Sequence, residues 1–439
     1  MPREQASKRR PSRRKTARPA APVREVSGEI GAIGAKGDGL LGIDGDLYHV
    51  PYTVPGDRGA FLVSEGRGEI KSLSARGPVL AEPICAHYRV CGGCQLQHVS
   101  EDFYRAWKRE RIVEALGRAG LGHVMVLPVV TTPAATRRRA RFSFRRHGKE
   151  LRLGFKKRNA HEIVSLSECH VLHAEIDMIR PALTELIDRL GLAVGDVAVT
   201  KCANGLDVSV NDKAKVKAEP DPLVVAELGH WMRAQNCLRL ALNGEVLLQL
   251  SVPVIHLQGI DIPVPVEGFL QASTEGEAVL IQEVIDTLEG ARRVGDLFSG
   301  IGTFALPLAR SRTVAAWDSD AAAIEALAKA GAAARRGGLV RYDISAEPRN
   351  LFTRPIMAAE LNKFDGLVID PPRAGAKEQA AEIAKSYVPR VAFVSCNPST
   401  FARDAKILVD GGYQLTQVTP VDQFVYSAHV ELVGRFERA

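Results

Sequence analysis

The sequence has no apolar run close to the roughly 18 residues that a membrane-spanning helix needs. No apolar signal-peptide core follows the N-terminus, so we expect a cytoplasmic protein with no membrane partner. Cysteine is scarce, and an odd number of seven without a secretion signal argues against a disulfide framework. We therefore expect reduced thiols or metal ligands. A chain of 439 residues is also too long for one typical core, which predicts two to four domains.

Positive charge is concentrated in two segments. Residues 1–24 hold nine Lys or Arg against one Glu, and residues 137–158 hold eleven against one Glu. Such clusters suit nucleic-acid phosphates, whose neutralisation releases counterions, although a solvated surface and a solubilising tail would look similar. Residues 1–23 are rich in Arg, Pro, Ala and Ser without apolar periodicity, and we interpret them as a disordered basic arm.

Short apolar runs punctuated by glycine follow the arm, up to about residue 74. Regular turn signals between short strands predict a small β-barrel, which we assign to a domain at 24–80. The pattern resembles the TRAM domain, an OB-like RNA-binding barrel. The alternative is a barrel that only packs on the rest of the protein.

Three cysteines then occur close together. Cys85, Cys91 and Cys94 are separated by five and two residues, with glycines that allow tight backbone approach. Cys169 is the best candidate for a fourth ligand. Four thiolates fit either a [4Fe–4S] cluster or tetrahedral zinc, and spacing alone does not decide. Cys202 and Cys237 lie in ordinary apolar surroundings and are expected to be structural.

The second basic segment alternates basic and apolar residues. We predict two strands joined by a turn at residues 147–150. The arginines on one face, Arg139, Arg141, Arg145 and Arg152, are expected to point at solvent or phosphate. Helical patterns near 173–190 and 221–233 complete a mixed α/β region, so that 81–265 is the predicted central domain.

The C-terminal third, 266–439, alternates predicted strands and helices. The predicted strands cover 293–298, 313–317, a segment ending at Asp343, 366–370 and 391–394, and the helices cover 274–288, 320–334 and about 379–387. A capping-box pattern at Thr274 starts the first helix. This alternation predicts a doubly wound parallel sheet that binds ligands at the carboxyl ends of its strands.

Two motifs lie at those strand ends. The Ser-Gly-Ile-Gly-Thr turn at 299–303, with Asp318 after the next strand, fits a dinucleotide or an S-adenosylmethionine site. A third glycine in register is missing, which weakens the dinucleotide interpretation. Two prolines after Asp370 end its strand and leave the carboxylate facing the crevice. Arg373 stands where amino-directed methyltransferases carry an aromatic residue, which argues against that class.

Cys396 follows the last strand of the alternation. A helix from about Thr400 to Val409, with Ser399 as its expected cap, begins just after this thiol. The positive helix end would favour thiolate over thiol. A buried core cysteine is the alternative, and the local residues alone leave the two even.

Five motifs occur in the order found in the uracil-5 RNA methyltransferase family, which the chain resembles over roughly 24–439. They are Gly268-Phe269-Leu270-Gln271, the loop 296–306, Asp370-Pro-Pro-Arg-Ala-Gly, Ser395-Cys396-Asn397-Pro398 and His429-Val430-Glu431. The four-cysteine set is similar to the iron–sulfur site of the ribosomal-RNA branch. The resemblance implies an α/β class I methyltransferase fold (doubly wound, Rossmann-like), with an N-terminal OB-like β-barrel and a central α/β iron–sulfur domain.

The resemblance also implies roles for individual residues. Cys396 would add to carbon 6 of uracil, and Glu431 would remove the proton from carbon 5. Methyl-donor positions fall on Gln271, Phe298, Thr303, Asp318, Asp343 and Asp370. The substrate positions are Phe269, Gln271 and Asp370, with Arg139 and Arg141 of the basic ribbon beside them. Ser299 replaces a family cysteine, and Thr303 and Asp343 replace asparagines, so oxygen-bearing groups remain in place at all three.

We therefore expect an S-adenosylmethionine-dependent uridine-5 methyltransferase whose partner is RNA, with 23S rRNA favoured over tRNA. The cofactors are the methyl donor and a [4Fe–4S] cluster, with zinc as the alternative occupant, and no protein partner is evident. Two other hypotheses stay open. One is a non-catalytic RNA-binding or assembly protein, and the other is a cysteine-independent methyltransferase that uses Asp370.

Overall fold

The computed structural model describes residues 22–214 and 222–438. The predicted basic arm, 1–23, therefore lies almost entirely outside the described residues. The contacts of the chain separate two compact units, one of residues up to 34 together with 38–78 and one of the remaining residues. No helix within the described ranges is both long and apolar enough to cross a membrane.

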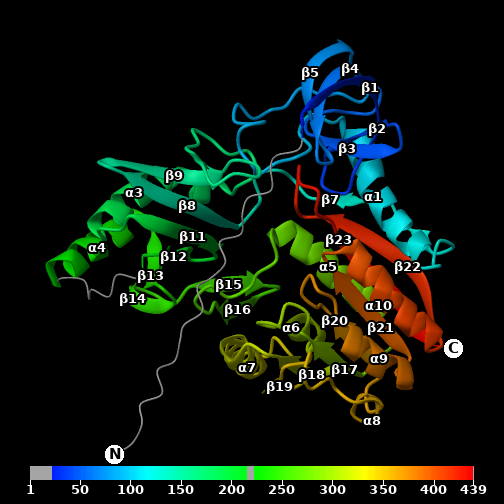
Figure 1. Ribbon diagram of the computed structural model, residues 1–439. Coiled ribbons are helices and arrows are strands. Elements are labelled where there is room, and N and C mark those ends of the chain that lie inside the picture. Colours follow the sequence, from blue (N-terminus) through cyan, green and yellow to red (C-terminus); the bar gives the residue numbers. More distant parts are fainter. Residues whose placement is uncertain (1–21, 215–221, 439) are drawn as a thin grey trace, which may run out of the picture. The chain divides into compact units, whose positions relative to one another are not determined.

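The first unit is a closed five-stranded barrel (Figure 1). Alternating side chains such as Ile30, Leu41 and Phe61 fill its interior. Gly59 allows a close crossing, because a Cβ there would lie 2.1 Å from the carbonyl oxygen of Ser72. The predicted β-barrel is confirmed, while its identity as a TRAM domain stays a prediction. In ladder order the strands are β1 (Arg24–Ile33), β2 (Gly39–Ile43), β3 (Asp46–Val50), β5 (Arg67–Ala75) and β4 (Arg58–Ser64).

The second unit contains a seven-stranded sheet covered by helices. Apolar residues of α2 (Ala174–Met178), α3 (Arg180–Arg189) and α4 (Pro222–Ala234) pack with the strands in one core. The predicted hairpin is present, and Cys202 and Cys237 are buried as expected. In order the strands are β10 (Ile163–Val164), β9 (Glu150–Lys156), β8 (Arg139–His147), β11 (Val194–Cys202), β12 (Gly205–Asp212), β13 (Cys237–Leu242) and β14 (Glu245–Gln249), and the separate hairpin β15 (Val254–Leu257) and β16 (Ile260–Pro263) follows.

The C-terminal sheet has the predicted doubly wound arrangement, with strand order β19-β18-β17-β20-β21-β23-β22-β6. The five strands from β19 to β21 run parallel, and β23 is antiparallel to β21. The chain leaves β17 toward β18 on one side and returns to β20 on the other, so the switch point lies between β17 and β20. The main strands are β17 (Arg293–Leu297), β18 (Thr313–Asp318), β19 (Ile344–Pro348), β20 (Gly366–Ile369), β21 (Arg390–Ser395), β22 (Tyr413–Asp422) and β23 (Glu431–Arg438).

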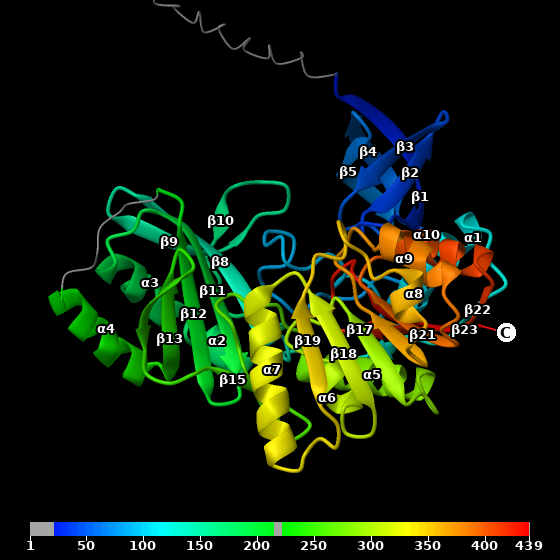
Figure 2. The same cartoon turned by 90° about the horizontal axis from the view of Figure 1, so that it is seen from below.

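Helices cover both faces of this sheet. In Figure 2, α7 runs alongside β19 and β18, and α9 and α10 lie near β21. The helices are α5 (Thr274–Thr287), α6 (Ala305–Leu308), α7 (Ala321–Arg336), α8 (Ala358–Leu361), α9 (Lys377–Lys385) and α10 (Pro398–Asp410). Two predicted caps are one or two residues late. Ser273 rather than Thr274 caps α5, and Asn397 rather than Ser399 caps α10.

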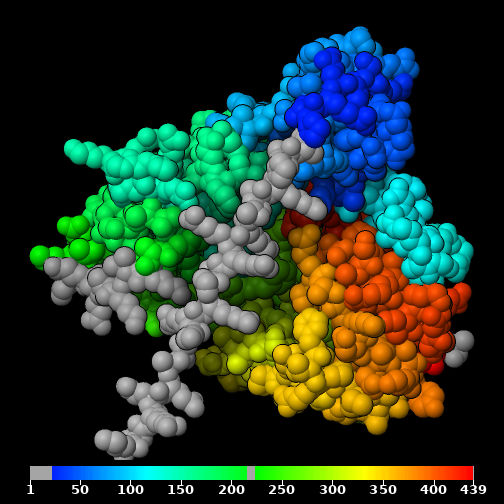
Figure 3. All heavy atoms as spheres, viewed as in Figure 1, coloured from blue at the N-terminus to red at the C-terminus, as the bar shows by residue number. Residues whose placement is uncertain are grey.

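Residues 101–131 pack with the C-terminal sheet rather than with the seven-stranded one. Helix α1 (Glu101–Arg118) shares a core with β20 and β21, and β6 (Met125–Val126) and β7 (Val130–Thr131) pair parallel with β22. Lys108 of α1 forms a fully buried ion pair with Asp422. Figure 3 shows α1, in cyan, lying against the red C-terminal segment. The sequence pattern did not predict this helix, because its apolar residues alternate irregularly with charged ones.

One predicted strand is displaced. The segment expected to end at Asp343 is a loop, and β19 begins at Ile344. Two backbone N–H groups of that loop, at Arg341 and Tyr342, donate to the carbonyl of Ala309, which holds it outside the ladder. Asp343 therefore precedes its strand and lies at the amino end of β19, away from the ligand-binding edge of the sheet.

Candidate active site

A cavity of about 940 Å³ opens at the carboxyl ends of β17, β18, β20 and β21 and extends to the cysteine-rich loop. Ligand cavities in proteins commonly have this size. All predicted site residues except one line it. They are Cys85, Cys91, Cys94, Arg139, Arg141, Cys169, Phe269, Gln271, Phe298, Thr303, Asp318, Asp370, Cys396 and Glu431.

The exception is Asp343, whose predicted contact with the methyl donor is wrong. Its side chain is 91% exposed and lies 3.5 Å from the guanidinium of Arg335. The cause is the displaced strand, because the cavity opens at the carboxyl ends of the parallel strands and Asp343 precedes β19 instead of following it.

The glycine turn after β17 brings backbone groups to the cavity. Gly300 and Gly302 have φ angles of +53° and +95°, in the region that favours glycine. The Asp318 carboxylate accepts hydrogen bonds from the N–H groups of Gly300 (2.9 Å) and Asp320 (2.8 Å), and so fixes the turn. Ser299 Oγ is buried without a hydrogen-bond partner among the described residues. Such an orphaned hydroxyl beside an acidic strand end suits a polar ligand such as a nucleoside.

Two aromatic rings border this end of the cavity. Phe298 has a φ of +65°, which is strained for a bulky residue, and its ring lies 5.4 Å from that of Phe352. Both rings line the cavity. Phe352 was not predicted as a site residue, because the strand before it is displaced from its expected position. An aromatic residue shortly after β19 was the signal in the sequence that could have predicted Phe352 as part of the site.

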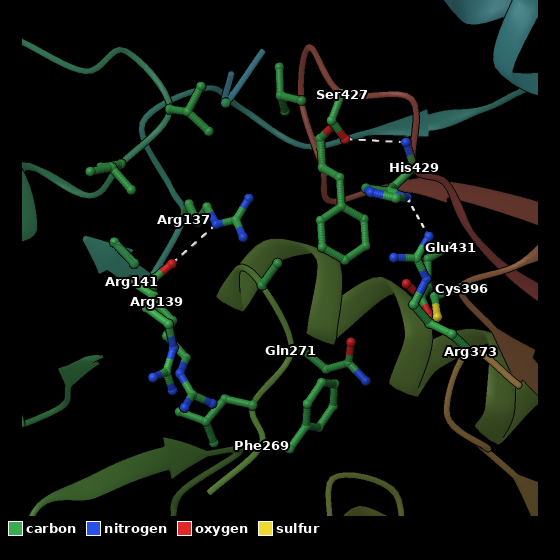
Figure 4. Close-up of a pocket in the computed structure, with 18 of the residues that line it drawn as sticks. Arg137, Arg139, Arg141, Phe269, Gln271, Arg373, Cys396, Ser427, His429 and Glu431 are labelled. Atoms are coloured by element: carbon green, nitrogen blue, oxygen red, sulfur yellow. Dashed lines mark hydrogen bonds between the residues drawn. The ribbon is translucent and has the colours of Figure 1, made fainter. Parts of the chain in front are cut away.

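Cys396 and Glu431 meet across a β-ladder. Ser395 of β21 pairs with Leu432 of β23, so the antiparallel register puts Cys396 opposite Glu431. Side chains at opposed positions have Cβ atoms about 4.5–5.5 Å apart. Figure 4 shows the thiol beside the Glu431 carboxylate and the Arg373 side chain. Cys396 and Glu431, which are well separated in the sequence, are thus adjacent in the cavity.

The expected thiolate does not form at rest. Burial, followed by the charges of Glu431 and Asp370, raises the pKa of Cys396 to about 12. The predicted effect of the helix end is outweighed, because two carboxylates and a partly dehydrated site all disfavour a negative sulfur. Cys396 is therefore a thiol at neutral pH before ligands bind.

Two carboxylates line the cavity, of which Glu431 is buried and Asp370 is half-buried. Burial and the charge of Asp370 raise the pKa of Glu431 to about 8. Burial and the charge of Asp318 raise the pKa of Asp370 to about 7. Groups that titrate near neutrality inside a cavity are typical of general acids and bases.

Gln271 is held firmly between these groups. Its Nε2 donates to Asp370 (3.3 Å), and its Oε1 accepts from Gln423 Nε2 (2.7 Å). Arg138 Nε donates to the Gln271 carbonyl (2.9 Å), and the same guanidinium forms a buried pair with Glu277. Gln423 and Arg138 were not predicted as site residues, because their shared partner Gln271 lies more than 100 residues away from each.

Arg139 and Arg141, which were predicted to point at solvent or phosphate, contact the loop before Phe269. The Arg139 guanidinium donates to the carbonyl oxygens of Gly268 (2.7 Å) and Glu267 (3.0 Å), and so supports the loop that carries Phe269. Arg141 is more exposed and pairs with Glu267 at 3.2 Å. Phe269 itself is 69% exposed and lines the cavity. Its ring is available to stack on a base.

Arg373 and His429 form the wall beside Cys396. Arg373 Nη2 donates to His429 Nδ1 at 3.3 Å (Figure 4). Burial, followed by the charge of Arg373, lowers the pKa of His429 to about 4, so its ring is neutral. A neutral imidazole can accept from the arginine while the rest of the guanidinium faces the cavity.

The four predicted metal ligands gather in another part of the same cavity. Burial raises the pKa values of Cys91, Cys94 and Cys169, and the neighbouring thiols raise them further. Coupling of this kind acts only between groups that lie near one another. Across 22–214 and 222–438, however, no group of three His, Cys, Asp or Glu side chains is arranged to hold a metal ion.

Comparison with known proteins identifies the class of this chain. The family described as "tRNA (Uracil-5-)-methyltransferase" matches residues 263–437. An "Uncharacterized RNA methyltransferase" of Caulobacter vibrioides is 41% identical over 415 residues, which cover 93% of this chain and 99% of that protein. The chain belongs to the RNA (uracil-5-)-methyltransferase family. It is therefore an RNA methyltransferase of the S-adenosylmethionine-dependent class.

Two further proteins are similar to this methyltransferase, one in sequence and one in structure. The 23S rRNA (uracil(1939)-C(5))-methyltransferase of Pectobacterium atrosepticum is 29% identical over 448 residues, which cover 97% of this chain and 96% of that protein. The crystal structure of the Pyrococcus abyssi tRNA (uracil-54, C5)-methyltransferase, in complex with S-adenosyl-L-homocysteine, has a TM-score of 0.70 at 23% identity. The match covers 93% of this chain and 99% of the Pyrococcus chain, and it confirms the class I methyltransferase fold.

Proposed function

We propose that the protein transfers a methyl group from S-adenosylmethionine to carbon 5 of a uridine in 23S rRNA, through a temporary bond between Cys396 and carbon 6. The observation that carries this proposal is the opposition of Cys396 and Glu431 in one cavity. Asp318 and its glycine turn, at the end of the same sheet, supply a site for the donor.

The chemistry requires both a nucleophile and a base. Carbon 5 of uracil is a poor nucleophile, so Cys396 first loses its thiol proton to solvent and regains one after the thiolate has left. Sγ bonds to carbon 6, and the electron pair of the double bond moves toward the carbonyl at carbon 4. Carbon 5 then bonds to the methyl carbon as the carbon–sulfonium bond breaks. Glu431 takes the proton from carbon 5, the double bond re-forms, and the thiolate leaves carbon 6. The products are 5-methyluridine, S-adenosylhomocysteine and one proton.

The resting charges explain why the thiol reacts only in the complete complex. Glu431 and Asp370 disfavour thiolate at Cys396. S-adenosylmethionine supplies a positive sulfonium when bound, and a nearby positive charge favours thiolate. Gln271 and Asp370 line the same cavity as the donor turn and Cys396, where they can hold the uracil edge. Phe269 would stack on the target base after it leaves its helix or loop.

The choice of 23S rRNA over tRNA has two supports. The relative of 29% identity acts on 23S rRNA by its name. The barrel and the four-cysteine set are the features by which the sequence resembles the ribosomal-RNA branch. The barrel, as a TRAM-like domain, and the exposed arginines of β8 and β9 would hold the flanking RNA backbone.

Cys85, Cys91, Cys94 and Cys169 would hold a [4Fe–4S] cluster. Their chemistry fits, because four free thiols line one part of the cavity. The methylation needs no electron transfer, so the cluster would tie the cysteine loop to the segment around Cys169. Iron and sulfide analysis of anaerobically purified protein and of C169S tests this assignment.

Incubation of donor with RNA that contains 5-fluorouridine tests the mechanism, because fluorine at carbon 5 cannot be removed as a proton. We expect a covalent protein–RNA complex that survives denaturation and depends on both donor and Cys396. A non-catalytic RNA-binding protein would give no complex, and a cysteine-independent enzyme would methylate RNA in the C396A variant. Mapping 5-methyluridine in 23S rRNA and tRNA from cells with and without the gene tests the substrate.

A further inference from the structure

A chain of hydrogen bonds crosses the floor of the cavity. Gln271 Nε2 donates to Asp370 Oδ2 (3.3 Å), and Gln423 Nε2 donates both to Gln271 Oε1 (2.7 Å) and to Glu431 Oε2 (3.3 Å). The two carboxylates of the site are thus joined through two amides. Gln423 is the one member of this chain that has no role in the function proposed above.

We propose that Gln423 is a positioning residue, which orients the Gln271 amide and holds the Glu431 carboxylate for proton removal from carbon 5. This inference rests on the proposed function. Gln423 itself does not line the cavity, so it acts through its two partners rather than on the substrate.

A backbone group fixes the direction of the whole chain. The N–H of Ala272 donates to Gln423 Oε1 at 2.9 Å. Because a backbone N–H can only donate, the Gln423 amide must turn its oxygen to Ala272 and its NH₂ group to Gln271 and Glu431. Gln271 must then present its oxygen to Gln423 and its own NH₂ group to Asp370. Both carboxylates consequently receive a donor.

Packing holds Gln423 in this orientation. Its side chain is buried, and Gly276 in the first turn of α5 lies against it, since a Cβ at Gly276 would be 2.7 Å from the Gln423 Cβ. Arg138 donates from its own N–H to the Ala272 carbonyl and from Nε to the Gln271 carbonyl. The segment that orients Gln423 is therefore fixed on both sides, which suits a preorganised site.

The donated hydrogen bond has a direct consequence for the base. Glu431 is buried beside Asp370, and both effects favour its protonated form. The Gln423 N–H opposes them by stabilising the carboxylate. Without it, more Glu431 would carry a proton at neutral pH and could not accept the proton from carbon 5. Elimination of the thiolate would slow, whereas addition of the thiol to carbon 6 would not.

Single-turnover methylation of uridine RNA with labelled donor separates the two steps. The Q423M variant keeps the approximate volume and loses both donors, and Q423E keeps the oxygen that accepts from Ala272. For both we expect release of methylated RNA to slow about 10- to 100-fold, as for loss of a hydrogen bond to a charged group. Denaturation-resistant complex should accumulate, and the rising limb of release against pH should move to higher pH.

Thr419, on strand β22 just before Gln423, offers a matched control. It is buried, and its Oγ1 donates to Glu283 at 2.8 Å, remote from the cavity lining. T419V should leave both addition and release unchanged. Release at the wild-type rate in Q423M and Q423E, or an equal loss of addition and release without a shifted pH limb, would overturn the inference. No complex with wild-type protein would instead refute the proposed function.

Discussion

Cys396 and Glu431 stand opposite each other, one position beyond the last paired residues of β21 and β23. The covalent nucleophile and the proposed base are therefore set by the register of one antiparallel ladder rather than by loop flexibility. A slip of one residue would turn every side chain of β23 to the other face. Buried apolar residues on both faces of these strands, such as Phe393 and Val433, make that slip costly.

Replacing Glu431 with Gln should trap the reaction after methyl transfer. The amide cannot accept the carbon-5 proton, so the thiolate cannot leave carbon 6. We expect turnover to fall about 10²- to 10⁴-fold, the usual range for a positioned acid or base, while a labelled protein–RNA complex accumulates on denaturing gels. C396A should give neither product nor complex. If E431Q released methylated RNA at the wild-type rate, another group would be the base.

The release step should depend on pH with a defined sign. Glu431 acts as a base only when ionised, and its pKa is raised to about 8, so release should increase with pH and level off above about 8. The charge of Asp370 is one cause of that raised pKa. D370N removes this charge, so the limb should move to lower pH. Release from a preformed adduct is the measurement, because D370N also affects substrate binding, and an unmoved limb would contradict the coupling.

Much of this site could be predicted from local signals. The abrupt end of an apolar strand at Ser395 located Cys396, and two prolines located Asp370. The predicted position of Asp343 at the end of a strand was wrong, because the loop after α7, with Gly337 and Gly338, is longer than the apolar pattern indicates. Its length decides which end of β19 the carboxylate reaches.

Interactions between distant segments could not be predicted. Arg139 was expected to point at solvent or phosphate, but it donates to the carbonyl oxygens of Glu267 and Gly268, which lie far along the chain. The prediction that Cys396 would have a lowered pKa was wrong for the same reason. The helix end that favours thiolate is adjacent in sequence, whereas the carboxylates that outweigh it arrive through the sheet. A sequence pattern shows the neighbouring helix end, but it does not show the carboxylates that the fold brings to Cys396, whose effect on its pKa is larger.

Variants of the buried ion pair between Arg138 and Glu277 should distinguish the effect of Arg138 on stability from its effect on catalysis. R138M leaves an unpaired buried carboxylate, which should lower the free energy of unfolding by about 3–5 kcal/mol. Adding E277L removes that carboxylate and should restore most of the stability in urea denaturation. The double variant should remain slow in methylation, since Gln271 has lost the guanidinium that holds its carbonyl. Full activity in the double variant would show that this anchor is unnecessary.

Two glycines of the donor turn provide a matched pair of variants. Both have positive φ, so alanine at either should add a similar backbone cost of roughly 1 kcal/mol. A Cβ at Gly302 would lie 2.4 Å from Leu327 Cδ1, whereas a Cβ at Gly300 would meet nothing within 4 Å. Leu327 is fully buried in the core beneath the turn, so it cannot move aside without repacking. We expect G302A to weaken S-adenosylmethionine binding by about tenfold more than G300A, as an additional overpacking cost of roughly 1–3 kcal/mol implies. Calorimetric titration of each variant measures the difference, and equal dissociation constants would show that the core beneath the turn does not shape the donor site.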